Sequence, residues 1–144
     1  MTPIKDALEL LTAQHEQIDD LFEQVRQIGD EAAFVELADK LSTHLALEQD
    51  VFYPAIAKQL SPEVMNELAA EHAAIKHVIG DLVWLGTRDA DFRPKLARLG
   101  ELLDGHSAWQ EDELFTAAAE TMTSAELAAL CDQFYNFDSI AIAA

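Results

Sequence analysis

Apolar residues recur in steps of three and four along four long segments of this chain, which is the period of an α-helix. The segments cover residues 4–25, 34–55, 65–82 and 92–117. No segment alternates apolar and polar residues with a period of two, so we expect no strands. Four amphipathic helices with short connections predict an all-α fold, an antiparallel up-down four-helix bundle.

A short fifth helix is expected after the bundle, at about residues 124–137. Thr123 and Glu126 have the spacing of a capping box at its start. The 144 residues, half of them apolar, fit one domain with a sizeable core. We therefore place the bundle at about 3–119 and treat residues 1–144 as a single domain.

The charge of the chain limits the partners it is expected to have. A net charge of −18 repels nucleic acid and anionic membranes. There is no run of 18 apolar residues, so we expect no membrane span, and the N-terminus lacks the pattern of a signal peptide. These features predict a cytoplasmic protein. The single Cys131 excludes an internal disulfide and is expected in the core.

The two halves of the chain resemble each other. The stretch QHEQIDDLF around His15 resembles EHAAIKHVI around His72, and HLALEQDVFYP from His44 resembles HSAWQEDELFT from His106. Such a pattern indicates an internal duplication of a helix pair. The resulting approximate two-fold axis brings the equivalent histidines of both halves to one place.

Those four histidines lie within the apolar stripes, one on each helix of the bundle. A neutral imidazole in an apolar core needs a partner for both ring nitrogens, and a metal ion satisfies one of them. Glu48 lies one turn after His44 on the same stripe, where a cation would favour its charge. Mixed imidazole and carboxylate ligands suit iron, with zinc, manganese or copper as alternatives. The Glu-x-x-His motif of ferritin-like sites is absent from these stripes.

As a set, these residues resemble the hemerythrin family, in its broad bacterial form called the HHE cation-binding domain. The resemblance covers about residues 4–118 and also includes the Glu71–His72 pair. It implies a bundle that holds two iron ions with an oxo or hydroxo bridge. The implied ligand set has one iron on His15 and His44, the other on His72 and His106, and Glu48 between them.

The chain departs from the family pattern at Gln110, where a second bridging glutamate is expected; glutamine is neutral and is a possible weak ligand through its side-chain carbonyl. Three residues are candidates to replace it. Glu111 has the spacing of invertebrate hemerythrins but lies about 140° round a regular helix, so it needs a bulge. Glu113 lies on the stripe and needs none. Tyr53 follows the first motif as a potential phenolate ligand. The alternatives are surface charge for both glutamates and core packing for Tyr53.

The predicted function is that of a non-haem iron protein that binds, senses or reacts with O2, NO or peroxide. Few histidine ligands leave open coordination positions, which favours redox reactivity over reversible carriage. One alternative is an iron-binding or iron-sensing module without turnover. Another is a metal-free structural bundle.

Three further residues are interpreted from their positions. His77 lies five residues after His72 and is expected at the surface, without a metal. Gly100 and Gly105 interrupt the fourth helix, where glycine costs roughly 1 kcal/mol, and we expect them to allow close approach of a neighbouring helix.

Overall fold

The computed structural model describes residues 4–143, with side chains through residue 137, and contains no strand in that part of the chain. The long helices are α1 (Ala7–Ile28), α2 (Glu31–Leu47), α4 (Pro62–Leu85) and α5 (Phe92–Trp109). The chain continues from α2 through a π-helical segment, α3 (Tyr53–Ile56) and a 3-10 turn (Ala57–Gln59), and from α5 through a second π-helical segment into α6 (Phe115–Thr121). The predicted all-α bundle is confirmed.

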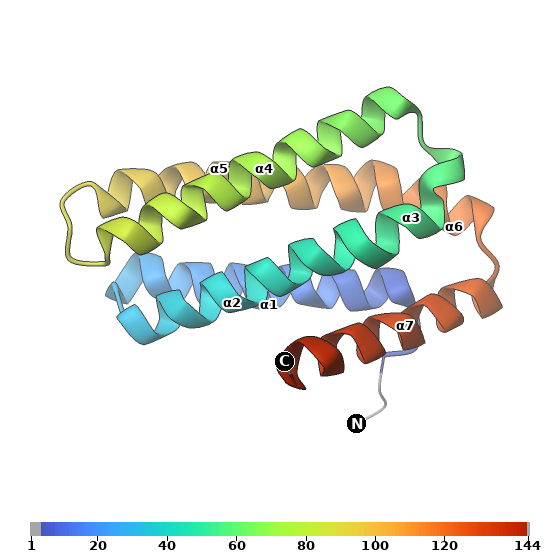
Figure 1. The fold of residues 1–144 in the computed structure, drawn as a ribbon, viewed down its shortest axis with the longest axis horizontal. Helices are drawn as coiled ribbons and strands as arrows, with labels where there is room; N and C mark the ends of the chain where they lie inside the picture. The colour runs from blue at the N-terminus through green and yellow to red at the C-terminus, as the bar shows by residue number, and fades with distance from the viewer. Residues whose placement is uncertain (1–3, 144) are drawn as a thin grey trace.

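The four long helices run alternately up and down (Figure 1). The α1–α2 and α4–α5 turns lie at one end of the bundle. At the other end α7 (Ser124–Ala143) folds back and contacts α1 and α2. This last helix is longer than the expected 124–137.

Side chains that cap the helices fix where the elements begin. Asp30 accepts a hydrogen bond from Ala32 N at 3.0 Å at the start of α2. The capping box before α7 is present: Thr123 N donates to Glu126 Oε1 at 2.9 Å, and Glu126 N donates to Thr123 Oγ1 at 3.1 Å. Each such cap stabilises its helix by about 1 kcal/mol.

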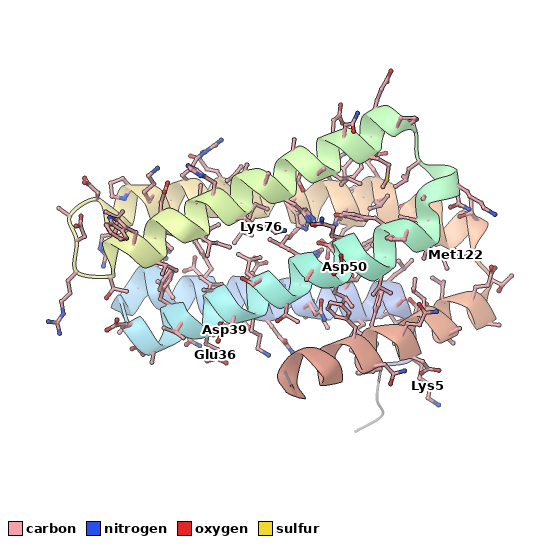
Figure 2. All side chains as sticks on the ribbon, in the orientation of Figure 1. Lys5, Glu36, Asp39, Asp50, Lys76 and Met122 are labelled. Atoms are coloured by element: carbon pink, nitrogen blue, oxygen red, sulfur yellow. The ribbon has the colours of Figure 1, made fainter. Side chains whose placement is uncertain are left out.

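The core consists of two apolar clusters with a polar layer between them. One cluster, built around side chains such as Leu41 and Leu99, lies toward the α1–α2 and α4–α5 turns. The other, with Phe52 and Phe134, lies toward α7 and includes the fully buried Cys131. Charged side chains such as Glu36 lie on the outside (Figure 2), and none of the described helices is long and apolar enough to cross a membrane.

Two π-helical segments interrupt the bundle at equivalent places in the two halves. They are Glu48–Phe52, after α2, and Gln110–Leu114, after α5. Pro54 cannot donate to the carbonyl of Asp50, which favours a wider turn in the first half. The second half has Thr116 at this place, and its hydroxyl bonds the carbonyl of Asp112 at 2.9 Å.

Each π turn adds one residue and so moves the buried face along by one position. A regular helix would have placed Val51 and Glu113 inward, as the stripe predicted. Instead Phe52 and Leu114 are buried and Glu113 is exposed. The sequence pattern was therefore correct up to the π segments and wrong beyond them.

Gly100 on α5 leaves room for the Phe22 side chain of α1. A Cβ atom there would lie 2.7 Å from Cζ of Phe22 on α1, so only glycine fits without displacing that ring. The expectation is confirmed for Gly100. It is wrong for Gly105, where a Cβ atom would meet nothing within 4 Å.

Candidate metal centre

The polar layer consists of six side chains that are at most 3% exposed. They are His15, His44, Glu48, His72, His106 and Gln110. The four long helices contribute one histidine each, and the two π segments contribute the carboxylate and the amide. Such burial is costly unless the polar atoms find partners.

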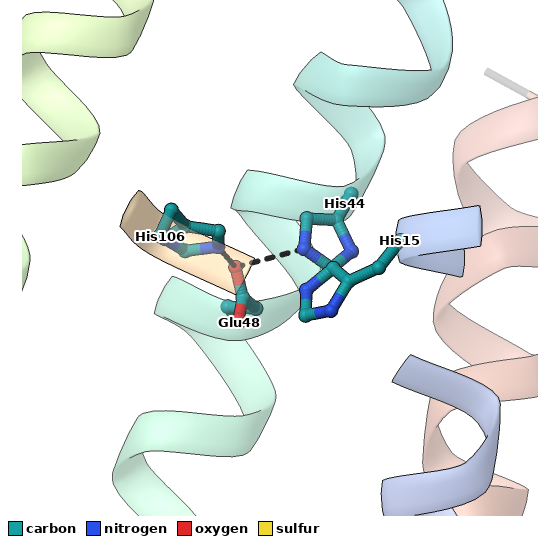
Figure 3. A group of neighbouring side chains, drawn as sticks. All are labelled: His15, His44, Glu48 and His106. Carbon is teal, nitrogen blue, oxygen red and sulfur yellow. Dashed lines mark hydrogen bonds and ion pairs between the residues drawn. The ribbon is translucent and has the colours of Figure 1, made fainter. Parts of the chain in front are cut away.

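Glu48 lies at the centre of the layer. Its Oε1 is 3.1 Å from Nε2 of His44 and 3.1 Å from Nε2 of His106, both drawn in Figure 3, and 3.5 Å from Nε2 of His72. Burial acts to raise the pKa of this carboxyl, but the facing imidazoles, His44 foremost, hold the pKa well below its usual range. The carboxylate is therefore ionised and touches histidines of both halves.

His15 is the least satisfied of these side chains. Its ring centroid lies 4.8 Å from that of His44 and 5.7 Å from that of His106 (Figure 3). Neither of its ring nitrogens has a hydrogen-bond partner among the described residues. Burial, reinforced by the nearby His44, lowers the pKa of His15 to about 3. The ring is thus neutral and has a free lone pair, which is the form that binds a metal.

Two residues outside the layer orient its imidazoles. Nδ1 of His44 donates to Oε1 of Gln14 at 2.7 Å, and Nδ1 of His106 contacts Oε1 of Glu71. Burial lowers the pKa of His106, but its bonds to Glu48 and Glu71 outweigh that effect and raise the pKa to about 9. Outer partners of this kind fix the ring orientation of metal-binding histidines.

Sequence reasoning missed the role of Gln14, and the duplication contained the signal. Gln14 precedes His15 as Glu71 precedes His72. In each half, this preceding residue binds the histidine of the next helix. Aligning the two repeats position by position would have pointed to Gln14 once Glu71 was noted.

Tyr53 lies inside the centre, 4% exposed. Its hydroxyl lies 3.1 Å from Nε2 of His72 and accepts a hydrogen bond from Nε2 of Gln110 at 2.7 Å. Burial and the charges of Glu48 and Glu71 raise the pKa of the phenol, so the hydroxyl is neutral in this arrangement. Its place beside His72 fits the predicted alternative ligand, and that role stays a prediction.

Gln110 occupies the position that the duplication pairs with Glu48. Its amide nitrogen donates to Oε2 of Glu48 and to the Tyr53 hydroxyl. Its Oε1 is buried without a hydrogen-bond partner among the described residues. The centre thus has one buried carboxylate and one amide.

The structure separates the two glutamates proposed as substitutes. Glu113 is exposed and faces away from the centre, because the π turn shifts it off the buried face; that prediction was wrong. Glu111 lies at the rim, with Oε1 3.6 Å from Nδ1 of His15 and its side chain 37% exposed. His77 is at the surface as expected, with its side chain 78% exposed.

The donor set fits a cation. One ligand atom from each of His15, His44, Glu48 and His106 lies within 4.8 Å of the others. Both His15 nitrogens, His44 Nε2 and Gln110 Oε1 are buried without a hydrogen-bond partner among the described residues. Such atoms are favoured in an apolar core when an ion binds them. Fold and site together define a metal-binding helical bundle.

Comparison with known proteins gives the family. Residues 6–118 match the hemerythrin HHE cation-binding domain. The chain belongs to this family, as its motifs indicated.

Two further comparisons give similar proteins. The crystal structure of a hemerythrin HHE cation-binding domain-containing protein from Mycobacterium kansasii has a TM-score of 0.84 and 22% identity, over 97% of this chain and 90% of that one. It shares the fold. A DNA nickase from Nostoc sp. is 20% identical over 120 residues, which make up 81% of this chain and 34% of the nickase. The chain thus spans about a third of the length of that curated relative.

Proposed function

We propose that this protein binds iron as a pair of ions in the polar layer and uses them to bind or react with O2, NO or peroxide. The proposal follows from the family, from the buried histidine and glutamate cluster, and from the preference of mixed imidazole and carboxylate sites for iron. Zinc, manganese and copper are the competing metals.

The ligands divide between the two halves of the duplication. His15 and His44 would hold one ion, and His72 and His106 the other. Glu48, whose Oε1 lies within 3.5 Å of histidine nitrogens from both halves, would connect them. With a single buried carboxylate for two cations, the outer carboxylates contribute to charge balance: Glu71 through His106 and Glu111 beside His15.

The observation that most supports the proposal is the burial of His15 without a hydrogen bond to the described residues. A neutral imidazole that is 3% exposed, and whose two nitrogens have no hydrogen bond to any described residue, loses several kcal/mol of hydration without compensation. Packing alone offers no reason to keep such a residue in an apolar core. A bound cation would satisfy one of its nitrogens.

Iron bound here would supply open coordination positions for a small ligand. The residues around it would do three things. Apolar side chains of the two core clusters exclude bulk water. Gln14 and Glu71 hold the imidazoles of His44 and His106 in place. The Tyr53 hydroxyl and the Gln110 amide present polar hydrogens toward the centre.

Elemental analysis with an optical spectrum tests the proposal. Protein purified without oxygen and reconstituted with Fe2+ should hold two iron ions per chain, and its spectrum should change on exposure to O2, NO or peroxide. His15→Gln should bind less iron, while His77→Gln, which alters an exposed histidine, should bind as the unaltered protein does. Iron-free protein after reconstitution, or equal loss in both variants, contradicts the proposal.

One observation favours a second function, an iron-binding or iron-sensing module without turnover. Gln110 replaces a charged bridge by a neutral amide and is already bonded to Glu48 and Tyr53. This favours a site in which bound iron stabilises the folded protein and no reaction is catalysed. Iron at 100 times its Kd should then add about 2.7 kcal/mol to the free energy of unfolding while loaded protein leaves peroxide and O2 unconsumed.

We do not propose nucleic acid as a partner of this protein. The nickase likeness covers a third of that protein, and a net charge of −18 repels a polyanion. A gel-shift assay with duplex and single-stranded DNA should therefore show no complex at physiological salt.

A further inference from the structure

Exposed apolar side chains gather at the end of the bundle where the α1–α2 and α4–α5 turns lie (Figure 1). Five large hydrophobic side chains of the described residues are exposed, and four of them are at this end. Ile28 ends α1, Val35 lies in the second turn of α2, and Val83 and Trp84 lie in the last turn of α4. Trp84 is 89% exposed. A cluster of this kind marks an interaction surface, whereas isolated apolar side chains do not.

The arginines of the chain gather at the same end. All four lie in the last turn of α1, in the α4–α5 turn or in the first two turns of α5: Arg26, Arg88, Arg93 and Arg98. Residues 84–98 contain four cationic residues and two carboxylates, a net charge of +2, while the rest of the chain has 5 cationic residues and 25 carboxylates, a net charge of −20. Arg88 and Arg93 pair with no carboxylate among the described residues. This stretch is therefore the part of an acidic protein that attracts an anionic group.

Trp84 borders a groove between α4 and α5. The groove has a volume of about 560 Å³, and Leu85 and Pro94 add to its apolar lining. Lys95 and Arg98 line it from α5. Tryptophan and arginine are the residues most enriched among those that contribute most to protein–protein binding. The groove thus has the composition of a protein-binding site.

The cations of the groove are held only by exposed ion pairs. Nζ of Lys95 lies 3.0 Å from Oδ2 of Asp81, and a guanidinium nitrogen of Arg98 lies 3.2 Å from Oε2 of Glu101. The side chains of Lys95 and Arg98 are 44% and 59% exposed, and ion pairs of this kind contribute at most about 1 kcal/mol. Carboxylates of a partner can therefore replace Asp81 and Glu101 at little cost.

We propose that the α4–α5 groove binds an acidic segment of a partner protein, which places an apolar side chain against Trp84 and carboxylates beside Lys95 and Arg98. A second copy of this chain fits less well, because a symmetric contact would bring like charges together. An anionic membrane also fits less well, because a net charge of −18 repels it. The apolar cluster that includes Leu82 and Leu96 lies between this groove and the polar layer, so the inference does not depend on the proposed function.

Selection from short random peptides displayed on phage, with the whole protein as bait, tests the groove without assuming a partner sequence. The enriched peptides should have more carboxylates than cations and at least one large apolar residue. When such a peptide binds, the tryptophan fluorescence should shift to shorter wavelength, because the exposed Trp84 becomes covered. The other tryptophan, Trp109, is already half-buried in the core cluster beyond the polar layer, and Trp84→Phe should abolish the shift.

Isothermal titration calorimetry with a selected peptide measures the contribution of each part of the groove. Trp84→Ala should weaken binding about 30-fold, which is the size of effect expected for a residue at the centre of an interface. Lys95→Gln combined with Arg98→Gln should weaken binding about tenfold, because two exposed ion pairs are lost. Binding by the unaltered protein should also weaken as the salt concentration rises.

Two variants with matched changes outside the groove are the controls. Tyr135→Ala removes an exposed aromatic side chain on α7, and Lys40→Gln combined with Lys58→Gln removes two exposed cations. Both should bind the peptide within twofold of the unaltered protein, and circular dichroism verifies that every variant is folded.

Five results would overturn the proposal. Three concern the peptides: no enrichment, enriched peptides without an excess of carboxylates, or equal losses of affinity in the controls and the groove variants. The other two would assign the surface to a different occupant. They are dimers in sedimentation that Trp84→Ala abolishes, and binding to vesicles of phosphatidylserine and phosphatidylcholine that Trp84→Ala abolishes.

Discussion

Gln110 donates its side-chain amide to Glu48, the residue that the internal duplication pairs with it. Each follows a histidine by four residues and begins a π-helical segment. The approximate symmetry of the bundle therefore brings an anion and a neutral donor into contact, where two glutamates would repel. The metal-free centre is stabilised by this asymmetry, and a second negative charge for the metal is lost.

Replacing Gln110 by glutamate should make the metal-free protein less stable and should strengthen its binding of iron. Gln110→Glu places two carboxylates in contact inside the core and should lower the free energy of unfolding of metal-free protein by about 3 kcal/mol. It should also tighten iron binding, because the cations gain a second buried anion. Urea unfolding with a chelator measures the first effect, and iron titration measures the second.

Gln24→Glu is the matched control, since Gln24 is exposed on α1. It changes the net charge equally and should alter neither quantity. Weaker iron binding in Gln110→Glu would show that the amide itself contributes to the site.

The Tyr53 hydroxyl should matter both with and without metal. Tyr53→Phe removes the partner of His72 and of Gln110 and should lower the stability of metal-free protein by about 1 to 3 kcal/mol. If Tyr53 is an iron ligand, the ferric protein should also lose a visible phenolate-to-iron absorption band. Tyr135→Phe, which removes a hydroxyl bonded to the carbonyl of Ile4 on the surface, should leave that band unchanged.

The stability of metal-free protein should fall as the pH is lowered below about 6.5. His15 has a folded pKa of about 3 against an ordinary 6.5, so between these values the unfolded chain binds the extra proton. This single group makes the free energy of unfolding rise by about 1.4 kcal/mol per pH unit across that window. His106 acts in the opposite sense. Its pKa is raised to about 9, so its contribution is complete below 6.5 and lost as the pH rises through 9.

Unfolding by urea at a series of pH values, with a chelator present, measures these slopes. His15→Gln should flatten the acid side, and His106→Gln should flatten the side between 6.5 and 9. His77→Gln is the control and should leave both unchanged. An acid slope that persists in His15→Gln would assign the titration to other groups.

The sequence predicts the parts of this centre that lie on regular α-helices. The period of the stripes places His15, His44, His72 and His106 correctly, because each lies within an uninterrupted helix. It fails for Glu113, because the π-helical segment Gln110–Leu114 adds one residue to the turn and moves the buried face along by one position. The regular helical period does not include this extra residue, although Pro54 and Thr116 mark its place in the two halves.

Alanine substitutions at Gly100 and Gly105 test how tightly the surroundings of α5 are packed at these two positions. Both lie within α5, where replacing glycine by alanine gains up to about 1 kcal/mol of helix propensity. At Gly105 the new methyl group meets nothing within 4 Å, so Gly105→Ala should stabilise the protein by about that amount. At Gly100 the methyl group meets the Phe22 ring at 2.7 Å, and overpacking of this kind costs about 1 to 3 kcal/mol. Gly100→Ala should therefore destabilise the protein by about 1 kcal/mol net.

A double-mutant cycle separates the clash with the Phe22 ring from the other effects of Gly100→Ala on stability. In a Phe22→Leu background the ring is gone, so Gly100→Ala should cost less than it does beside Phe22 and approach the gain seen at Gly105. Thermal unfolding of the four proteins in this double-mutant cycle gives the coupling energy between the two positions. A coupling energy near zero would mean that the cost at Gly100 does not come from a clash with the Phe22 ring.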